Sequence, residues 1–314
     1  MKSTRFLFLI LLMLGSFAKG QNITFHSNTL YPEGTAFSKK QQVFFVSSLN
    51  HGQIGKLDFS GNYTPFIQDP ELIATVGILA DDKRDLLYVT NTDNGVAEKT
   101  NPKTASKLSE IIAYDLHTGK RKFKVDLGAL NPGQPNFVND LTIDNEGNLY
   151  VTNSFSPILF KIDKNHKGSI FAKNDAWTGA GYNLNGIVYN PDGYLIVAQS
   201  NKGLLYKIDI KNPSKMTTVK LIEGDLRGAD GLILNGKNEL AVISHVYWKT
   251  YRVISGDNWS SAEKTDSTKS ILTFPTTGVL VNGKYYILNA KVNELFDPKA
   301  VKTDNFMLQE VKFK

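Results

Sequence analysis

The sequence predicts an all-β protein, a six-bladed β-propeller of four-stranded antiparallel blades around a central channel. Three observations predict this fold. A phrase occurs six times in which a small or amide residue precedes an apolar strand, a polar turn and a second apolar strand. Four of the five steps between phrases are 43 to 47 residues long, as in propeller blades. Turn-forming Asn, Asp and Gly recur at one place in the phrase, which begins at Glu33-Gly34, Gly77-Ile78, Asn139-Asp140, Asn185-Gly186, Asp230-Gly231 and Thr277-Gly278.

The third repeat shows the expected strands most clearly. Its first two strands are predicted over 138–144 and 149–153, joined by a turn at 145–148. Two more are predicted over 158–162 and 169–172. Such a four-stranded meander cannot bury its apolar surface alone, whereas six meanders in a ring can.

The fourth repeat has the same order of elements. Its strands are predicted over 186–189, 194–198, 204–208 and 217–221. Ring closure requires that the two ends of the chain share a blade. We therefore expect residues 23–26 to pair beside residues 307–313.

One step is 62 residues long because of a polar insertion at 92–107, between the second and third strands of the second blade. Connections of this kind lie at the same end of the ring as the start of each first strand. The insertion is therefore expected over the opening of the channel, either as a lid or as a disordered surface segment. The same end should carry the last residues of the second strands, Ser48, Asn91, Asn153, Gln199, His245 and Lys291.

Residues 1–20 have the pattern of a secretory signal peptide, and residues 21–314 form the predicted propeller. Basic Lys2 and Arg5 precede an apolar run and the small residues Ala18 and Gly20. We therefore expect a secreted or periplasmic protein, with no membrane association after cleavage. The chain has no cysteine, so its core must stabilise it without disulfides.

The charge of the mature chain gives no support to nucleic-acid binding. Without Lys2, Arg5 and Lys19 the chain has 33 basic and 30 acidic residues, a net charge of about +3. The expected partner is a small-molecule substrate, and the protein is expected to be a monomer.

Four of the six phrases begin with an oxygen-bearing side chain, at Glu33, Asn139, Asn185 and Asp230. If each begins an innermost strand, all four meet at the axis of the ring. Two carboxylates and two amide oxygens suit Ca²⁺, although Zn²⁺, Mn²⁺ or Mg²⁺ is also possible. The alternative is that each side chain only hydrogen-bonds nearby backbone.

These residues lie in motifs that resemble the family of senescence marker protein 30 and gluconolactonase, which is related to the diisopropyl fluorophosphatase and paraoxonase propellers. The resemblance implies that the four residues bind a catalytic divalent ion, usually calcium. Thr75-Val76-Gly77 replaces the polar and basic residues that hold sugar lactones in the family, and Leu184 replaces a common Pro. The matching motifs are Pro32-Glu33-Gly34, Asn139-Asp140 with 144–151, Leu184-Asn185-Gly186-Ile187 and Gly228-Ala229-Asp230-Gly231.

The predicted function is a secreted Ca²⁺-dependent hydrolase of a lactone or related ester, with phosphotriester hydrolysis possible. Asp230 is the candidate general base or nucleophile, provided that it binds the ion through one oxygen. His245 is the candidate base or a residue that supports a metal ligand; the alternative is an ordinary hydrogen-bonded His at a blade edge. The alternative is a non-catalytic propeller that binds a small molecule or protein and holds a structural calcium.

Aromatic residues near these positions predict an apolar substrate pocket. The alternative is that they pack between blades, as aromatic residues of all-β proteins often do. They are Phe137, Trp177, Tyr182, Tyr247 and Trp248.

Overall fold

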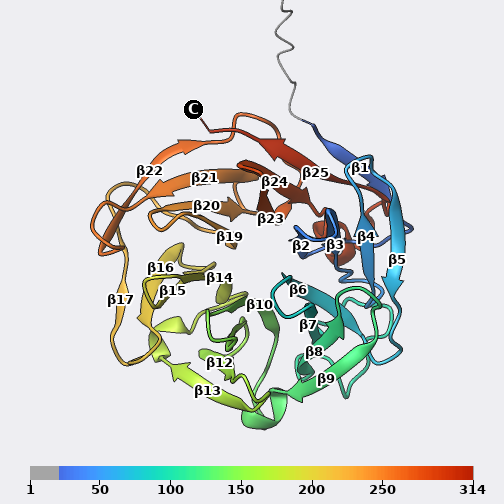
Figure 1. Ribbon diagram of the computed structural model, residues 1–314, viewed down its shortest axis with the longest axis horizontal. Coiled ribbons are helices and arrows are strands. Elements are labelled where there is room, and N and C mark those ends of the chain that lie inside the picture. Colours follow the sequence, from blue (N-terminus) through green and yellow to red (C-terminus); the bar gives the residue numbers. More distant parts are fainter. Residues whose placement is uncertain (1–20, 314) are drawn as a thin grey trace, which may run out of the picture.

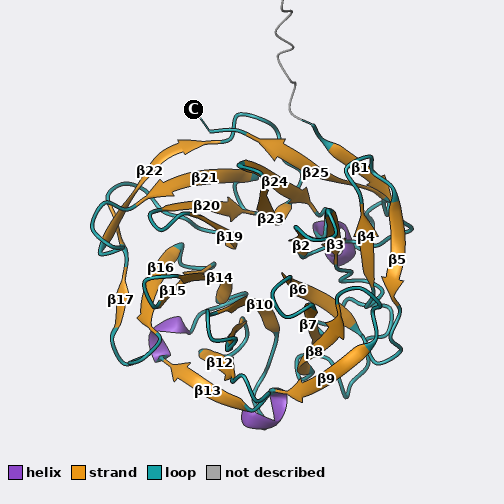
Figure 2. Cartoon of the chain, in the orientation of Figure 1, coloured by secondary structure: helices purple, strands orange, loops and turns teal. Residues whose placement is uncertain are grey.

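The computed structural model describes residues 21–313, and these form a closed ring of six β-sheets (Figure 1). The predicted signal peptide lies outside the described residues. Helix is confined, within 21–313, to α1 (Asn293–Phe296) and two 3₁₀ turns, η1 (Gly128–Leu130) and η2 (Asp175–Trp177) (Figure 2). None of these segments is long and apolar enough to cross a membrane. The predicted six-bladed propeller is confirmed.

The first three blades are antiparallel meanders that run in chain order from the axis to the rim. The first contains β2 (Thr35–Ser38), β3 (Val43–Val46), β4 (Ile54–Leu57) and β5 (Tyr63–Ile67). The second contains β6 (Ala74–Asp81), β7 (Leu86–Thr92), β8 (Ser109–Asp115) and β9 (Arg121–Asp126). The third contains β10 (Val138–Ile143), β11 (Leu149–Asn153), β12 (Ile158–Ile162) and β13 (Gly168–Lys173).

The fourth and fifth blades differ from the prediction at their junction. The fourth contains β14 (Leu184–Asn190), β15 (Tyr194–Gln199), β16 (Leu204–Asp209) and β17 (Met216–Thr218). The fifth contains β19 (Ala229–Asn235), β20 (Glu239–Ser244), β21 (Lys249–Ile254) and β22 (Ser261–Ser267), with β18 (Lys220–Leu221) parallel to β22. The strand predicted over 217–221 is therefore divided between two blades. Val219, between β17 and β18, is buried in the core at the place where the chain passes from one sheet to the next.

The sixth blade closes the ring with strands from both ends of the chain. It contains β23 (Pro275–Val281), β24 (Lys284–Asn289), β25 (Asn305–Val311) and β1 (Ile23–His26), in that order. β1 pairs antiparallel with β25, with Ile23 opposite Leu308. The predicted closure is confirmed, and β1 forms the outer edge of the blade beside β25 (Figure 1).

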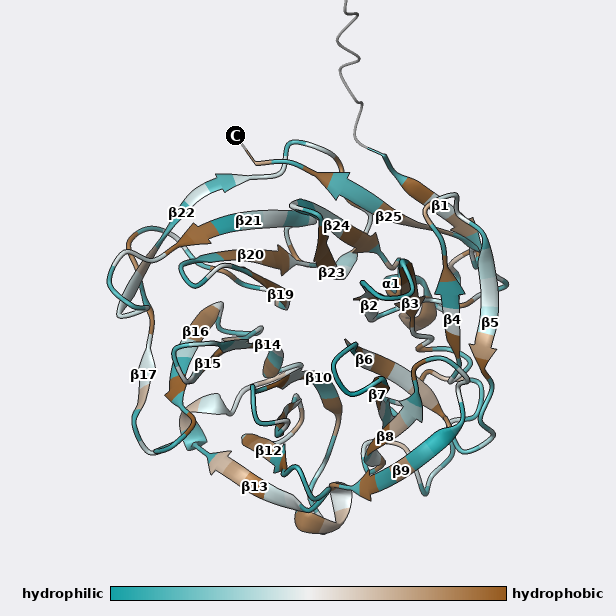
Figure 3. Ribbon diagram, in the orientation of Figure 1, coloured by the Kyte–Doolittle hydropathy of each residue, from teal (hydrophilic) through white to brown (hydrophobic). Residues whose placement is uncertain are grey.

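The hydrophobic core lies between adjacent blades, because the inner strands are covered on both faces and the outer strands are not. Every residue of β20 after Glu239 is buried, whereas no residue of β9 is. Figure 3 shows the same contrast between hydrophobic β20 and largely hydrophilic β22. The apolar second strands thus fix the blades side by side and leave the polar innermost positions at the axis.

Candidate metal centre

A β-bulge in the innermost strand places a pair of consecutive residues at the axis in five blades. In these five blades two residues of the inner strand lie opposite one residue of the second strand, so the register shifts by one residue. A bulge turns a side chain away from the regular alternation, here toward the channel. The bulged pairs are Val76-Gly77, Asn139-Asp140, Asn185-Gly186, Asp230-Gly231 and Thr276-Thr277, and in the first blade Glu33-Gly34 immediately precede β2.

This register corrects two of the predicted phrase starts, since the equivalent pairs begin at Val76 and Thr276 and not at Gly77 and Thr277. The second position favours glycine because the next blade lies against it. A Cβ on Gly34 would lie 2.0 Å from the Val76 carbonyl oxygen, and one on Gly186 would lie 2.1 Å from that of Asp230. In the second blade, the sequence repeat had aligned Gly77, the second residue of its pair, with the first residue of the pairs in other blades.

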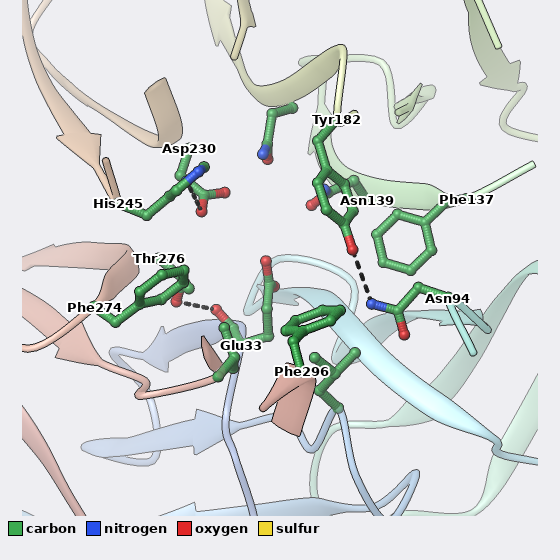
Figure 4. Close-up of a pocket in the computed structure, with 13 residues that line it drawn as sticks. Glu33, Asn94, Phe137, Asn139, Tyr182, Asp230, His245, Phe274, Thr276 and Phe296 are labelled. Atoms are coloured by element: carbon green, nitrogen blue, oxygen red, sulfur yellow. Dashed lines mark hydrogen bonds and ion pairs between the residues drawn. The ribbon is translucent and has the colours of Figure 1, made fainter. Parts of the chain in front are cut away.

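The four predicted ligands meet at the centre of the ring. They are called the axial oxygen residues and are Glu33, Asn139, Asn185 and Asp230. All four line an upper cavity on the opening side and also a second cavity deeper in the channel. The upper cavity holds about 450 Å³ of empty space, part of it open to solvent (Figure 4). Its other lining residues are Leu49, Asn94, Phe137, Tyr182, His245, Phe274, Thr276, Val292 and Phe296.

Asp230 is held by a single hydrogen bond that leaves one oxygen available. His245, one residue beyond the end of β20, has its Nδ1 3.0 Å from Asp230 Oδ2. An ionised carboxylate only accepts hydrogen bonds, so the imidazole donates from Nδ1, and in its neutral form the ring then has an unprotonated Nε2. Asp230 Oδ1 has no hydrogen-bond partner among the described residues, so one oxygen could bind a cation, and binding through one oxygen stays a prediction.

Asn139 is oriented in a similar way. Its Nδ2 donates to Ser154 Oγ at 3.0 Å, and that hydroxyl donates to the Leu184 carbonyl oxygen at 2.6 Å. The amide nitrogen is thus directed toward Ser154, and the Oδ1 atom is left as the ligand for an ion.

The electrostatics of the site favour a cation. Burial, and then the charges of Asp230 and Asp140, raise the pKa of Glu33 well above its usual value. Burial lowers the pKa of His245, but the hydrogen bond and charge of Asp230 outweigh it, so the net shift is upward. No Lys or Arg is among the lining residues of either cavity, so the chain supplies no permanent positive charge to offset the carboxylates.

Asp140 is a third channel carboxylate that the sequence analysis quoted in a motif but gave no role. It lines the deeper cavity, and its side chain accepts from the backbone N–H groups of Leu141 at 2.8 Å and Ile187 at 3.3 Å. Burial raises the pKa of Asp140 to about 7 despite these hydrogen bonds, and the charge of Asp230 adds to the shift. It occupies the position that glycine takes in four other blades.

The insertion of the second blade contributes Asn94 to the upper cavity. Asn94 Nδ2 donates to the Tyr182 hydroxyl at 3.0 Å, across the opening (Figure 4). The loop is fixed by Asp93, whose carboxylate accepts from Gly95 N–H, Thr100 Oγ1 and Thr104 Oγ1 at 2.6 to 2.8 Å. The insertion is therefore a hydrogen-bonded loop at one side of the opening and not a disordered segment, and its role as a lid stays a prediction.

Sequence reasoning did not find Phe274, Thr276 and Phe296. Phe274 adopts a φ of 46°, which is unusual for a bulky residue, and stacks on His245 with centroids 5.4 Å apart. Thr276 Oγ1 donates to the Glu33 carbonyl oxygen at 2.7 Å. Phe296 comes from α1, which the repeat pattern gave no reason to expect.

Most predicted second-strand ends have a structural role and not a place in the cavity. Asn91 Oδ1 accepts from Ile73 N–H at 2.9 Å, and Asn153 Oδ1 accepts from Phe137 N–H at 3.0 Å. These bonds fix the chain where it enters the innermost strand. Ser48, Gln199 and Lys291 also lie outside the lining of the upper cavity, which leaves His245 as the member of that set at the site.

Of the predicted aromatic pocket residues, Phe137 and Tyr182 line the upper cavity, whereas Trp177, Tyr247 and Trp248 lie outside its lining. Tyr247 lines a neighbouring groove. Trp177 is buried between blades beside Tyr206. Tyr247 and Trp248 are exposed in the turn between β20 and β21.

The donor set fits Ca²⁺ better than a softer metal. The part of the chain that the structure describes has no group of three or more His, Cys, Asp or Glu side chains placed to hold an ion. The axial oxygen residues instead combine two carboxylates with two amides, which are hard oxygen donors. One carboxylate oxygen and one amide oxygen are already oriented by His245 and Ser154.

No protein-family model matches the sequence, and no curated protein sequence matches it. Solved structures with a similar fold include the allergen Mala s 1 of Malassezia sympodialis, with 19% identity over 94% of this chain and 97% of that one and a TM-score of 0.73. A gluconolactonase of Xanthomonas campestris has 12% identity over 94% and 91% and a TM-score of 0.63. Virginiamycin B lyase of Staphylococcus aureus has 14% identity over 94% and 99% and a TM-score of 0.61.

At these identities the comparisons show the fold and leave the chemistry to the site. The gluconolactonase is among the proteins that share the fold, in agreement with the resemblance drawn from the sequence motifs. The chain thus has the propeller fold of gluconolactonase-like proteins.

Proposed function

We propose that this protein is a Ca²⁺-dependent hydrolase of a lactone or related ester, with phosphotriesters as a second substrate class. The observation that carries the proposal is the arrangement of Asp230. One of its oxygens is fixed by His245, and the other is free among the remaining axial oxygen residues. This arrangement supports the proposal that one carboxylate both orients a base and binds the cation.

Glu33, Asn139, Asn185 and Asp230 would hold the ion. When bound, a calcium ion supplies a positive charge that polarises a carbonyl or phosphoryl oxygen and stabilises the charge that develops on it. The calcium concentration outside cells matches the weak affinity of open sites, which agrees with the secretion proposed from residues 1–20.

His245 is suited to move the proton. In lactone hydrolysis the oxygen of water bonds to the carbonyl carbon, the ring C–O bond breaks, and a hydroxy acid forms. His245 Nε2 takes the proton from the attacking water and returns it to the leaving oxygen, while Asp230 stabilises the imidazolium. Direct attack by Asp230 on the carbonyl carbon is the alternative; it would break the ring C–O bond and form a mixed anhydride between Asp230 and the acyl group, which water then hydrolyses.

The test is hydrolysis of lactones, aryl esters and phosphotriesters by the mature protein, with chelator and with calcium restored. We expect activity that chelation abolishes and Ca²⁺ restores, and that Asp230→Asn removes. Asp192→Asn, an exposed carboxylate paired with Lys237, is the matched control and should retain activity. A single turnover in ¹⁸O-labelled water places the label in the product for direct water attack. Attack by Asp230, followed by hydrolysis at the Asp230 carbonyl carbon, instead places the label on Asp230 and leaves the product unlabelled.

The second candidate is a binding propeller with a structural calcium. It is favoured by the position of the axial oxygen residues, because an ion held there would join the first, third, fourth and fifth blades. No hydrolysis of the panel, together with a calcium-dependent rise in melting temperature, would support this candidate and contradict the hydrolase.

A further inference from the structure

The walls of the upper cavity are mostly apolar. They carry three phenylalanine rings from separate parts of the chain, Phe137 before β10, Phe274 before β23 and Phe296 in α1. Phe137 packs against Tyr182 with centroids 5.6 Å apart, so these rings form a fixed surface. Leu49 and Val292 complete the apolar wall around the axial oxygen residues.

Apart from the axial oxygen residues, most polar groups in this wall are used within the protein, and Asn94 Oδ1 is a buried acceptor left without a partner in the described part of the chain. Asn94 Nδ2 donates to the Tyr182 hydroxyl, and the Thr276 hydroxyl donates to the Glu33 carbonyl oxygen. His245 Nδ1 is taken by Asp230. A substrate with several hydroxyl groups would lose hydrogen bonds to water here and regain few, which weakens its binding.

The apolar surface continues outside the cavity. A groove of about 740 Å³, open to solvent, runs along the opening side of the fourth and fifth blades and shares Tyr182 and His245 with the cavity. Its outer wall includes Val246 and Tyr247, which are 57% and 39% exposed. Exposed apolar side chains that adjoin a cavity commonly mark a ligand surface.

We propose that the substrate carries an extended apolar chain or ring system and is not a polyhydroxylated sugar lactone. This inference rests on the proposed function. The reacting carbonyl lies at the axial oxygen residues, and the apolar group lies against Phe137, Phe274 and Phe296. The part that exceeds the cavity follows the groove past Tyr182 toward Val246.

The position of Phe296 makes it the side chain to test. It is 49% exposed at the mouth of the cavity, and α1 is held by the Tyr31 hydroxyl, which donates to Glu294 Oε2 at 2.6 Å. Truncation of Phe296 therefore removes apolar contact area without removing the bond that fixes the helix. Val301, 90% exposed in the same connection between β24 and β25, offers a matched control.

The experiment measures kcat/KM for six-membered lactones with alkyl chains of increasing length and for glucono-δ-lactone. While the chain fits, we expect a rise of about threefold to fourfold for each added methylene group. Phe296→Ala should lower kcat/KM about tenfold or more for chain-bearing lactones and by a clearly smaller factor for the unsubstituted one. Val246→Asp should affect only the longest chains, and Val301→Ala should match the wild type.

Calorimetric binding of the corresponding alkyl lactams, which the site does not cleave readily, separates this inference from the proposed function. Fastest hydrolysis of the sugar lactone, with no gain from alkyl chains, would overturn the inference and leave the hydrolase standing. Lactam binding that strengthens with chain length and weakens in Phe296→Ala, without hydrolysis of any lactone, would support the apolar site and overturn the hydrolase. A lactam affinity that does not change with the length of the alkyl chain would overturn the apolar site.

Discussion

Ser154 and His245 occupy the same place in their blades, one residue beyond the second strand, and each hydrogen-bonds the axial oxygen residue of its own blade. Ser154 Oγ accepts from Asn139 Nδ2 at 3.0 Å, and His245 Nδ1 lies 3.0 Å from Asp230 Oδ2. One position thus orients an amide in the third blade and a carboxylate in the fifth. Because the backbone repeats while the side chain differs, a neutral hydroxyl orients Asn139 and a titratable imidazole orients Asp230.

Ser154→Ala should weaken calcium binding. Without the hydroxyl, the Asn139 amide loses the acceptor that directs its nitrogen away from the axis, and loss of such a support typically costs about tenfold to a hundredfold in metal affinity. The measurement is the calcium dissociation constant by calorimetry. Ser156→Ala is the control, because Ser156 Oγ donates to the Pro135 carbonyl oxygen and touches no axial oxygen residue. Equal affinities in the two variants would contradict the orienting role.

Replacements of His245 separate proton transfer from positioning. Both His245→Ala and His245→Asn should lower kcat by about a hundredfold to ten-thousandfold, because neither side chain can serve as the base. Asn can still donate a hydrogen bond to Asp230, so its calcium affinity should stay nearer to that of the wild type. If His245→Asn instead keeps near-normal kcat, His245 only positions Asp230. The pH dependence of kcat/KM in each variant provides a second readout.

The effect of calcium on stability should grow with pH. Burial raises the pKa of Glu33, and it raises the pKa of Asp140 to about 7. An acid whose pKa rises on folding makes a contribution to stability that is fully present below its unfolded pKa. This contribution is lost as the pH rises from the unfolded pKa to the folded pKa. For Asp140 that window extends from the ordinary value of 3.8 to about 7. A bound cation favours the ionised forms, so it offsets the loss.

The measurement is the difference in melting temperature between calcium-loaded and chelator-treated protein from about pH 5 to about pH 8. We expect this difference to increase with pH, with proton release on calcium binding at neutral pH. A difference that stays constant or falls over that range would contradict the assigned protonation of Glu33 and Asp140.

Gly186→Ala should destabilise the ring strongly. The added methyl group would lie 2.1 Å from the Asp230 carbonyl oxygen and 2.9 Å from the Leu232 nitrogen, so the fourth and fifth blades must separate. We expect a loss of about 3 kcal/mol or more in the free energy of unfolding, measured with denaturant. Gly256→Ala is the control, since nothing lies within 4 Å of its Cβ position. Similar stabilities would show that the blade contact is not tight.

Much of the site could be predicted because a propeller repeats one local pattern. The period located the blades, and the position of Asn139, Asn185 and Asp230 within each repeat located them at the axis. The off-by-one placement in the second and sixth blades arose because Val76 and Thr276 are not polar acids or amides. A bulge admits two residues, and the sequence alone does not indicate which of them turns inward.

The roles of other residues depend on connections that do not repeat. Tyr182 meets Asn94 only because an insertion of the second blade reaches the loop before the fourth. Phe296 reaches the cavity from a four-residue helix in the sixth blade. Trp177 and Tyr247 were both predicted to line the pocket because they are aromatic. In the structure, Trp177 is buried between blades and Tyr247 is exposed.

The sequence by itself determined the number of blades, the closure through residues 23–26 and the four oxygen side chains at the axis, because strand period and turn chemistry are local properties. Only the tertiary structure decided that His245 meets Asp230, that Asp140 lies in the deeper channel, and that phenylalanines enclose the cavity. Those contacts join residues far apart in the chain, and their geometry is set by how the blades and their loops pack against one another.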